Sequence, residues 1–470
     1  MSPFFLSKTS SFRYVLILSG VMGFSSAAAA ESLTLQQSVA MALKQNRLLA
    51  ADQYRVDMAR AGMDEANGYL MPRVDASYSA MRSNSPMTVF GSRLLQKRVT
   101  NADFVPATLN HPAAINNYQP RLTLSMPLYQ GGALWAGRRQ AEQGVAASSS
   151  QHDWMRQQLM FQTIQTYMAW LNADAQLQAA EKTLEASGRY LNNVISMHKR
   201  GLLIESDVMD AEVHRLQSEV RVNQSRNAVA EARDMLARLT GVDADQLTQP
   251  IAAPEFQQPQ LSGEALTSAA LESRPDLKAL QAQLEGSRAG VDKARSSFLP
   301  HVAVQATQEW NNANPSVRNG NATVSAVVSM NIFAGGSDRA VVSRQEADAA
   351  RLSLELDDKR QQIGNEVREA VRQLTEAQKR SKTESRAMKQ AEESLRITEL
   401  RHLQGLEKTS DLLNAQSRAD MARAEAIRAG YDVSVAKAQL MLFTGRLGEE
   451  SLMAAAGQMN EDVNDKGNVQ

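Results

Sequence analysis

The segment Ser125-Met-Pro-Leu-Tyr-Gln-Gly-Gly132 is written twice in this chain, because it returns as Ser329-Met-Asn-Ile-Phe-Ala-Gly-Gly336. The offset between the two is 204 residues (329 minus 125). Gly201-Leu202 returns at the same offset as Gly405-Leu406. An offset that does not slip over this distance indicates two copies of one structural unit. Each copy is expected to run from the end of a strand through a long helix, round a glycine-containing turn and back along a second helix.

The duplication covers nearly all of the chain. Upstream of the segment the offset is 228, which aligns Leu43 with Leu271 and Pro72 with Pro300. The difference between the offsets (228 minus 204) puts 24 extra residues in the first copy, before Ser125. We therefore predict a first repeat over 31–241, a surface connection over 242–264, a second repeat over 265–445 and a polar tail over 446–470.

Proline is absent between Pro127 and Pro250 and again after Pro315. A proline inside a helix costs roughly 3 kcal/mol, so these intervals are free to hold very long helices. The first would measure ~100 Å at about 1.5 Å per residue. Its leucines recur every seven residues and alternate with small side chains, which favours a coiled-coil pair. The predicted helices are about 133–197 and 207–239 in the first copy and about 337–402 and 411–443 in the second, with further helical pattern over 32–67 and 265–297.

Apolar and polar side chains alternate on either side of the inserted residues. Val74 and Ala76 flank Asp75, and Leu122 and Leu124 flank Thr123. The second copy repeats this alternation, which predicts two β-hairpins over about 72–130 and 300–333. The pattern is typical of a half-buried strand in a soluble sheet. It is also typical of a membrane barrel strand, with lipid on one face and water on the other.

Residues 1–30 are predicted to be a removable secretory signal. Lys8 and Arg13 form a basic n-region, an apolar core follows, and four alanines precede Glu31. No later run of about 18 apolar residues predicts a transmembrane helix. The chain has no cysteine, which excludes disulfides, thiolate metal sites and a lipid anchor on an N-terminal cysteine. A formal net charge of zero offers no basic excess for nucleic acid.

A secretory signal, four alternating strands and no spanning helix together favour the barrel. Four strands cannot close a barrel, and open edges are not tolerated in lipid. Two chains would give eight strands, whose interior is filled by side chains, so an open duct needs three. The predicted fold class is mainly α with a small β part. The internally duplicated protomer would form a trimeric 12-stranded β-barrel and an α-helical tunnel, with loops 82–118 and 311–320 as the extracellular ends.

The chain resembles the TolC-like outer-membrane efflux family over essentially its whole length after the signal. The resemblance rests on the motif at Pro127–Gly132 with its echo at Asn331–Gly336, and on the paired turns Arg200-Gly-Leu202 and Gln404-Gly-Leu406. It implies a homotrimeric, passive exit duct in the outer membrane lipid of a Gram-negative bacterium, with the helical part in the periplasm. The implied partners are a periplasmic adaptor (membrane fusion) protein and an inner-membrane pump, either proton-driven or of the ABC type. Type I protein secretion is the alternative role within the family.

The resemblance also implies two sets of site residues. Contact with the adaptor is expected at the turns, namely Arg200, Gly201, Leu202, Gly405 and Leu406. A periplasmic gate is expected where the return helices begin, at Asp207, Asp210, Asp411 and Asn414. A ring of carboxylates there would narrow the pore and favour cations. Alternatively Asp207 and Asp411, each after a serine, act only as helix N-caps. Asn414 removes a charge that the family often carries, and Glu407 stands where some members have a basic residue.

His198 and His402 form a further repeat pair just before the turns. Six imidazoles near the entrance of a trimer would permit pH-dependent opening, whereas a solvated surface pair is the alternative interpretation. No nucleophile elbow, phosphate-binding loop or metal-spaced histidine cluster is present, so neither an enzyme nor a cofactor is expected. A secreted coiled-coil scaffold without a pore remains as the alternative to a duct.

Overall fold

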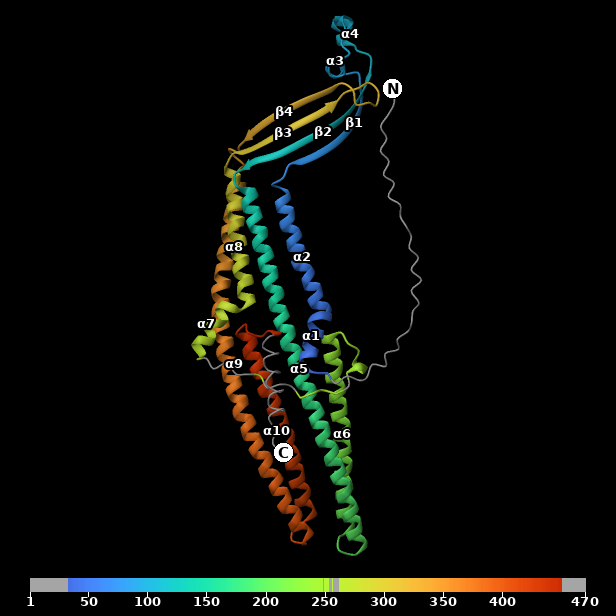
Figure 1. Ribbon diagram of the computed structural model, residues 1–470, viewed down its shortest axis with the longest axis vertical. Coiled ribbons are helices and arrows are strands. Elements are labelled where there is room, and N and C mark those ends of the chain that lie inside the picture. The colour runs from blue at the N-terminus through green and yellow to red at the C-terminus, as the bar shows by residue number, and fades with distance from the viewer. Residues whose placement is uncertain (1–32, 248, 253–255, 257–261, 450–470) are drawn as a thin grey trace, which may run out of the picture.

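The computed structural model describes residues 33–247, 249–252, 256 and 262–449. The predicted signal peptide and most of the predicted tail lie outside these residues, as does part of the predicted connection. The molecule is elongated, with a sheet at one end and long helices extending from it (Figure 1). In chain order the elements are α1 (Leu35–Gln45), α2 (Arg47–Gly68), β1 (Arg73–Ser83), α3 (Pro86–Leu95), η1 (Asn101–Phe104), α4 (Pro106–Asn110), β2 (Ile115–Gln130), α5 (Ala133–Lys199), α6 (Glu205–Thr240), η2 (Ala244–Gln246), α7 (Gly263–Ser273), α8 (Pro275–Arg295), η3 (Ser296–Phe298), β3 (His301–Trp310), β4 (Gly320–Ser329), α9 (Ser337–Leu403) and α10 (Thr409–Phe443).

The prediction of an internally duplicated, mainly α fold with a small β part is confirmed. Helices α5 and α9 each have 67 residues, and both begin after a glycine in the left-handed conformation, Gly132 (φ 86°) and Gly336 (φ 87°). Gly131 is restricted further, because a Cβ there would lie 2.5 Å from the carbonyl oxygen of Ser296. Each long helix packs against the return helix of its own copy, α6 on α5 and α10 on α9. Two helical hairpins therefore run side by side away from the sheet (Figure 1).

The four strands form one antiparallel sheet in the order β1-β2-β3-β4. Its register places side chains of one kind in rows across the strands. Val74 pairs with Leu124, Leu124 with Ala306, and Ala306 with Val324. The row three residues along the strands is polar, because Arg121 pairs with both Ser77 and Glu309, and Glu309 with Asn321. Successive side chains of a strand point to opposite faces, so the sheet has one apolar and one polar face.

The segments 32–67 and 265–297 were expected to be helical throughout, and this is wrong at one point in each copy. The first is broken at Asn46, whose side-chain oxygen accepts hydrogen bonds from the backbone N–H groups of Leu48 (3.0 Å) and Leu49 (3.1 Å) and so caps α2. The second is broken at Arg274, because Pro275 follows it and begins α8. Proline restricts the residue before it to extended conformations, which ends α7 there.

The cores lie where these breaks meet the long helices. In the first, Ile164, Tyr167 and Trp170 of α5 are buried in one cluster with Leu35 of α1 and Leu236 of α6. The hydroxyl of Tyr167 lies 2.7 Å from the carbonyl oxygens of Leu33 and Ile251, and burial raises its pKa to about 12. The second core repeats this with α7, α8, α9 and α10. Both cores brace the middle of the helical hairpins.

A search of the helices within the described residues finds none with an apolar stretch long enough to cross a membrane.

Candidate functional site: the helical turns and the entrance

The two turns at the far end of the helices have the same hydrogen-bonding pattern. In the first, Gly201 N–H donates to the His198 carbonyl (2.8 Å) and Leu202 N–H to the Met197 carbonyl (3.0 Å). In the second copy Gly405 and Leu406 repeat both bonds at 2.9 Å. This is the Schellman arrangement, which needs a residue in the left-handed conformation after the helix. Gly201 and Gly405 both have a φ of 74°, so glycine suits both positions.

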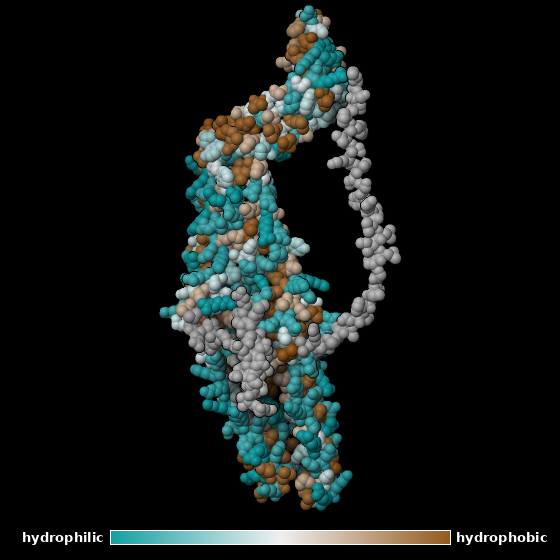
Figure 2. All heavy atoms as spheres, viewed as in Figure 1, coloured by the Kyte–Doolittle hydropathy of each residue, from teal (hydrophilic) through white to brown (hydrophobic). Residues whose placement is uncertain are grey.

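The turns present apolar side chains to the surface. Leu202 is 63% exposed and Leu406 is 64% exposed, and Ile204 and Leu403 beside them are exposed as well. In Figure 2 hydrophobic residues gather at this lower end and again over the sheet, while the upper helices are mainly hydrophilic. Arg200, the remaining predicted contact residue, caps α5, and its Nε donates to the Ser196 carbonyl (3.1 Å). The five predicted contact residues thus form two small patches, one on each helical hairpin.

The alternative to a gate role was that Asp207 and Asp411 act only as helix N-caps, and that assignment is wrong. The N-cap positions belong to Ile204 and Lys408, so each aspartate is the third residue of its helix. From there the Asp207 carboxylate accepts a hydrogen bond from the backbone N–H of Ile204 (3.2 Å). A carboxylate in the first turn also interacts favourably with the helix dipole. Asp207 therefore stabilises the start of α6 without being its cap.

The second pair of predicted gate residues shares a cleft. Asp210 of α6 and Asn414 of α10 both line a space of about 380 Å³ between the two helical hairpins. Both side chains are exposed, and Asp411 is exposed too. Asp207 and Asp411 do not line this cleft. The structure thus brings one predicted gate residue from each copy together and leaves the other two at separate helix starts.

The histidine pair makes the same bond in both copies but has different surroundings. The Nδ1 of His198 lies 2.9 Å from the Leu203 carbonyl oxygen, and that of His402 lies 3.0 Å from the Glu407 carbonyl oxygen. His198 is exposed, as the surface interpretation expected. His402 is only 7% exposed, so that interpretation is wrong for the second copy. The difference arises because the ring of Tyr190, from α5, packs against His402 (centroids 6.1 Å apart).

A polar joint between the hairpins was missed by the sequence reasoning. Asp420 of α10 is buried and accepts a hydrogen bond from the Thr183 hydroxyl of α5 (3.0 Å). Arg423 lies 3.4 Å from the same carboxylate and pairs with Glu392 of α9 (2.8 Å). In the sequence Asp420 is one charged residue among several on α10, and its partner Thr183 comes from the other copy. No local signal in the sequence could have identified this contact.

The main features at this end of the molecule are exposed apolar side chains at the turns and a cleft between the two hairpins. Within the described part of the chain, no three His, Cys, Asp or Glu side chains group as metal ligands would. Burial lowers the pKa of His214, which lies beside the cleft on α6, although the nearby Asp420 carboxylate opposes this. The helix starts near the turns carry the carboxylates of Asp207, which is half-buried, and Asp411, which is exposed. Such groups can attract or exclude ions electrostatically.

Comparison with protein families identifies one matching family model, described as outer membrane efflux protein. It matches residues 39–242 and 266–446, which are the two copies of the repeat. The family resemblance noted from the sequence motifs is therefore confirmed. The family consists of outer membrane channels, which agrees with the expectation that the chain is not an enzyme.

Curated relatives include proteins of both efflux and secretion systems. A probable efflux pump outer membrane protein, SepC of Pseudomonas putida, is 26% identical over 281 residues, covering 58% of this chain and 53% of SepC. The chain thus matches about half the length of that relative. The proteases secretion protein PrtF of Dickeya chrysanthemi is 22% identical over 459 residues, covering 94% of this chain and 95% of PrtF. Identity alone does not separate the two roles.

Solved structures with the same fold are also found. The crystal structure of a membrane protein from Pseudomonas aeruginosa superposes with a TM-score of 0.76 at 20% sequence identity. The match covers 88% of this chain and 91% of that protein. At this level of identity the likeness establishes the fold.

Proposed function

We propose that this chain, which belongs to the outer membrane efflux protein family, is the exit duct of a tripartite efflux system. It acts in the outer membrane of a Gram-negative bacterium, after export through the cleaved signal at 1–30, and its helices extend into the periplasm. It passively conducts substrates to the exterior from a periplasmic adaptor and an inner-membrane pump of the proton-driven or ABC type. The pump supplies the energy.

The observation that carries this proposal is the apolar face of the sheet. Val74 is 67% exposed, Leu124 42% and Val324 75%, so this face packs against nothing in the described chain. The opposite face is polar and carries the Arg121–Glu309 ion pair (2.8 Å). Exposing a row of large apolar side chains to water is unfavourable, whereas lipid would cover them without cost. One face to lipid and one to water is the pattern of a barrel wall.

The sheet also supports assembly from three copies. Strands β1 and β4 each pair on one side only among the described residues, so both edges need a partner. Along α6 an exposed apolar stripe follows helical spacing at Met209, Val213, Leu216 and Val220. A homotrimer closes a twelve-stranded barrel by edge pairing and lets each stripe pack on a neighbouring copy. The protomer alone satisfies neither need.

The two turn patches are the surfaces that the adaptor contacts in this proposal. They are the most distant part of the molecule from the sheet, so they face the inner membrane (Figure 1). Leu202 and Leu406 are the exposed apolar anchors. Asp207, Asp210, Asp411 and Asn414 surround the entrance in this proposal. The charge of the three aspartates favours cations, and contacts between the hairpins set the opening.

The test of the duct is localisation together with conductance. The full chain, expressed with its signal, is expected in the outer membrane fraction. The purified protein is expected to insert in planar lipid bilayers and to give discrete single-channel steps. A protein that fractionates as soluble, remains monomeric without detergent and makes no pores would refute the duct and favour a secreted coiled-coil scaffold.

The gate assignment has its own test in the same recordings. Asp207→Asn combined with Asp411→Asn keeps the hydrogen-bond acceptor at the helix starts but removes two carboxylates per chain. The reversal potential in a salt gradient is expected to move towards zero, because cation preference falls. Asp234→Asn, on an exposed site of α6 away from the turn, is the matched control. An unchanged reversal potential in the double variant argues against a charged ring.

The similarity to PrtF favours type I protein secretion as a second candidate. The two roles share the same duct and differ in the pump that it serves. Deleting the gene is expected to raise sensitivity to small toxic compounds if the duct serves efflux. Loss of a secreted protein from the culture medium, with unchanged sensitivity, would assign the chain to secretion instead.

A further inference from the structure

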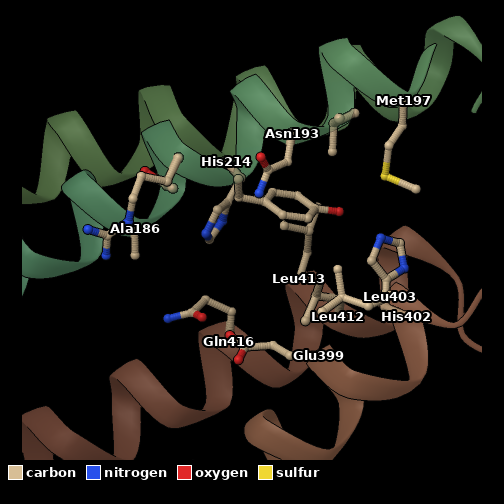
Figure 3. A pocket seen from close by; sticks show the side chains of 14 residues that line it. Ala186, Asn193, Met197, His214, Glu399, His402, Leu403, Leu412, Leu413 and Gln416 are labelled. Atoms are coloured by element: carbon tan, nitrogen blue, oxygen red, sulfur yellow. The ribbon is translucent and has the colours of Figure 1, made fainter. Parts of the chain in front are cut away.

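A cavity of about 290 Å³ lies between the two helical hairpins, a short distance from the turns. Figure 3 shows that its lining comes from both hairpins, with Asn193 and His214 on one side and His402 and Glu399 on the other. Val194, Met197 and Leu412 supply apolar walls. Cavities with mostly apolar walls and a few polar groups are typical of sites for small molecules.

His402 gives this cavity a hydrogen-bond acceptor with a defined orientation. Its Nδ1 lies 3.0 Å from the Glu407 carbonyl oxygen, and a carbonyl can only accept. This assigns the ring proton to Nδ1 and leaves a lone pair on Nε2. That Nε2 atom is buried and has no hydrogen-bond partner within the described part of the chain. The side chain is only 7% exposed.

One carboxyl group lines the cavity on the same side as His402, that of Glu399, and burial raises its pKa. Tyr190 from α5 packs its ring against the imidazole at a tilt of 55°, and burial raises the pKa of its hydroxyl. His214 from α6 has its pKa lowered by burial. Arg189 lines the rim but pairs with Glu185 (2.7 Å) one turn earlier. A buried acceptor without a partner is costly, and a ligand that donates to it recovers that cost.

We propose that this cavity binds a small aromatic molecule that carries one hydroxyl or amine donor. The donor group bonds His402 Nε2, and the rings lie between Tyr190 and the apolar walls. An apolar cavity of about 150 Å³ is enough for benzene, so a cavity of about 290 Å³ admits two fused rings. The molecule would contact both hairpins at once. Binding at this site can be measured without conduction, so the proposal does not depend on the duct.

The test uses 2-naphthol as the probe and naphthalene as the analogue without a donor. Both are titrated into the purified full chain in detergent, with no membrane or pump present, and binding is followed by calorimetry. We expect saturable binding at one site per chain, with 2-naphthol bound about fivefold to tenfold more tightly than naphthalene, as one recovered hydrogen bond requires. A failure of the duct proposal would leave this result unchanged.

Two variants and one matched control make the outcome decisive. His402→Phe keeps a ring of similar size and should abolish the preference for 2-naphthol, whereas His198→Phe, the exposed counterpart in the first copy, should keep it. Ala186→Leu fills the cavity from α5 without touching His402, and it should weaken both compounds alike. Circular dichroism checks that each variant is folded. No saturable binding, a preference that survives in His402→Phe, or binding unaffected by Ala186→Leu would each overturn the proposal.

Discussion

His198 and His402 occupy matched positions one turn before Gly201 and Gly405, and each makes the same bond to a carbonyl five residues on. Yet one imidazole is exposed and the other is enclosed by the opposite hairpin. The duplication has therefore preserved the backbone of the turns while the side-chain surroundings have diverged. Tyr190 of α5 packs against His402 beside the second turn, whereas the His198 side chain beside the first turn is exposed. The comparison teaches that matched residues need not share a role.

The breaks in the shorter helices differ in the same way. Asn46 and Arg274 align at the offset of 228, and each ends one helix and precedes another. Asn46 caps by neutral hydrogen bonds. Arg274 is 1% exposed, pairs with Asp276 (2.6 Å) and Glu366, and lies over the ring of Trp154 (4.8 Å). The break in the first copy is stabilised by hydrogen bonds of the Asn46 side-chain amide, and the break in the second copy by a buried network of ion pairs around Arg274.

The largest expected effect comes from breaking what the two copies share. Gly201→Glu combined with Gly405→Glu forces a side chain into a left-handed conformation at both turns and adds charge to both apolar patches. We expect complete loss of export, measured as increased drug sensitivity of the cells. The amount of the variant in the membrane should equal that of the wild type. The strain is local and costs about 1–2 kcal/mol per site, so the fold should survive.

The control for the turns is Gly430→Glu, which adds the same charge to an open, exposed and helical position of α10. It should leave export intact. Either single turn variant should retain part of the activity if the two patches act together. Normal export in the double variant would show that the turns do not carry the contact.

The next largest effect is expected when the charged network at the second break is removed. Arg274→Ala leaves Asp276 buried beside Lys359 alone and removes the contact with Trp154. Removing one partner of a buried ion pair costs about 3–5 kcal/mol, and we expect a fall of that size in the free energy of unfolding. Guanidinium titration in detergent, at fixed protein concentration, measures it. A loss below about 1 kcal/mol, typical of a surface pair, would contradict the buried network.

Much of the fold could be predicted from the sequence because it follows from local rules. Gly-Gly pairs before long proline-free intervals indicate where α5 and α9 begin, and alternation indicates the strands. The turns were predictable because a Schellman turn needs its glycine. Pro275 was a visible sign of the break before α8. Asn46 was a sign of the other break, because asparagine is a preferred N-cap residue and Leu48 and Leu49 follow it.

Two of the unpredicted features depend on contacts between the copies. The burial of His402 depends on Tyr190, and that of Asp420 on Thr183, each about two hundred residues away in the chain. Periodicity shows that a residue faces a neighbour, but it does not identify the neighbour. Asp207 and Asp411 were misassigned for a local reason, because a shift of three residues in the helix start separates an N-cap from a first-turn carboxylate.

A smaller effect is expected in the pH dependence of stability. Burial opposes the ionisation of Asp276, but Arg274 and Lys359 outweigh it and lower its pKa. A carboxyl whose folded pKa is lowered contributes stability above its unfolded pKa of about 3.9 and loses it as pH falls through the folded pKa. The difference in unfolding free energy between the wild type and Asp276→Asn should therefore be constant near neutral pH and shrink below about pH 4.

The smallest effect tests whether the first break depends only on hydrogen bonds. Asn46→Ala removes the cap of α2 and the bond from Nδ2 to the Leu239 carbonyl (3.1 Å), which ties the break to the end of α6. We expect a loss of about 1–2 kcal/mol, clearly below that of Arg274→Ala, because no charge is left buried. Asn46→Ser keeps a side-chain oxygen that can cap α2, but the serine side chain is too short to donate to the Leu239 carbonyl. This variant should therefore recover about half of the lost stability. If Asn46→Ala lowers the free energy of unfolding as much as Arg274→Ala does in the same titration, the hydrogen-bonded break and the charged break contribute equally to stability. The proposed difference between the two copies would then be wrong.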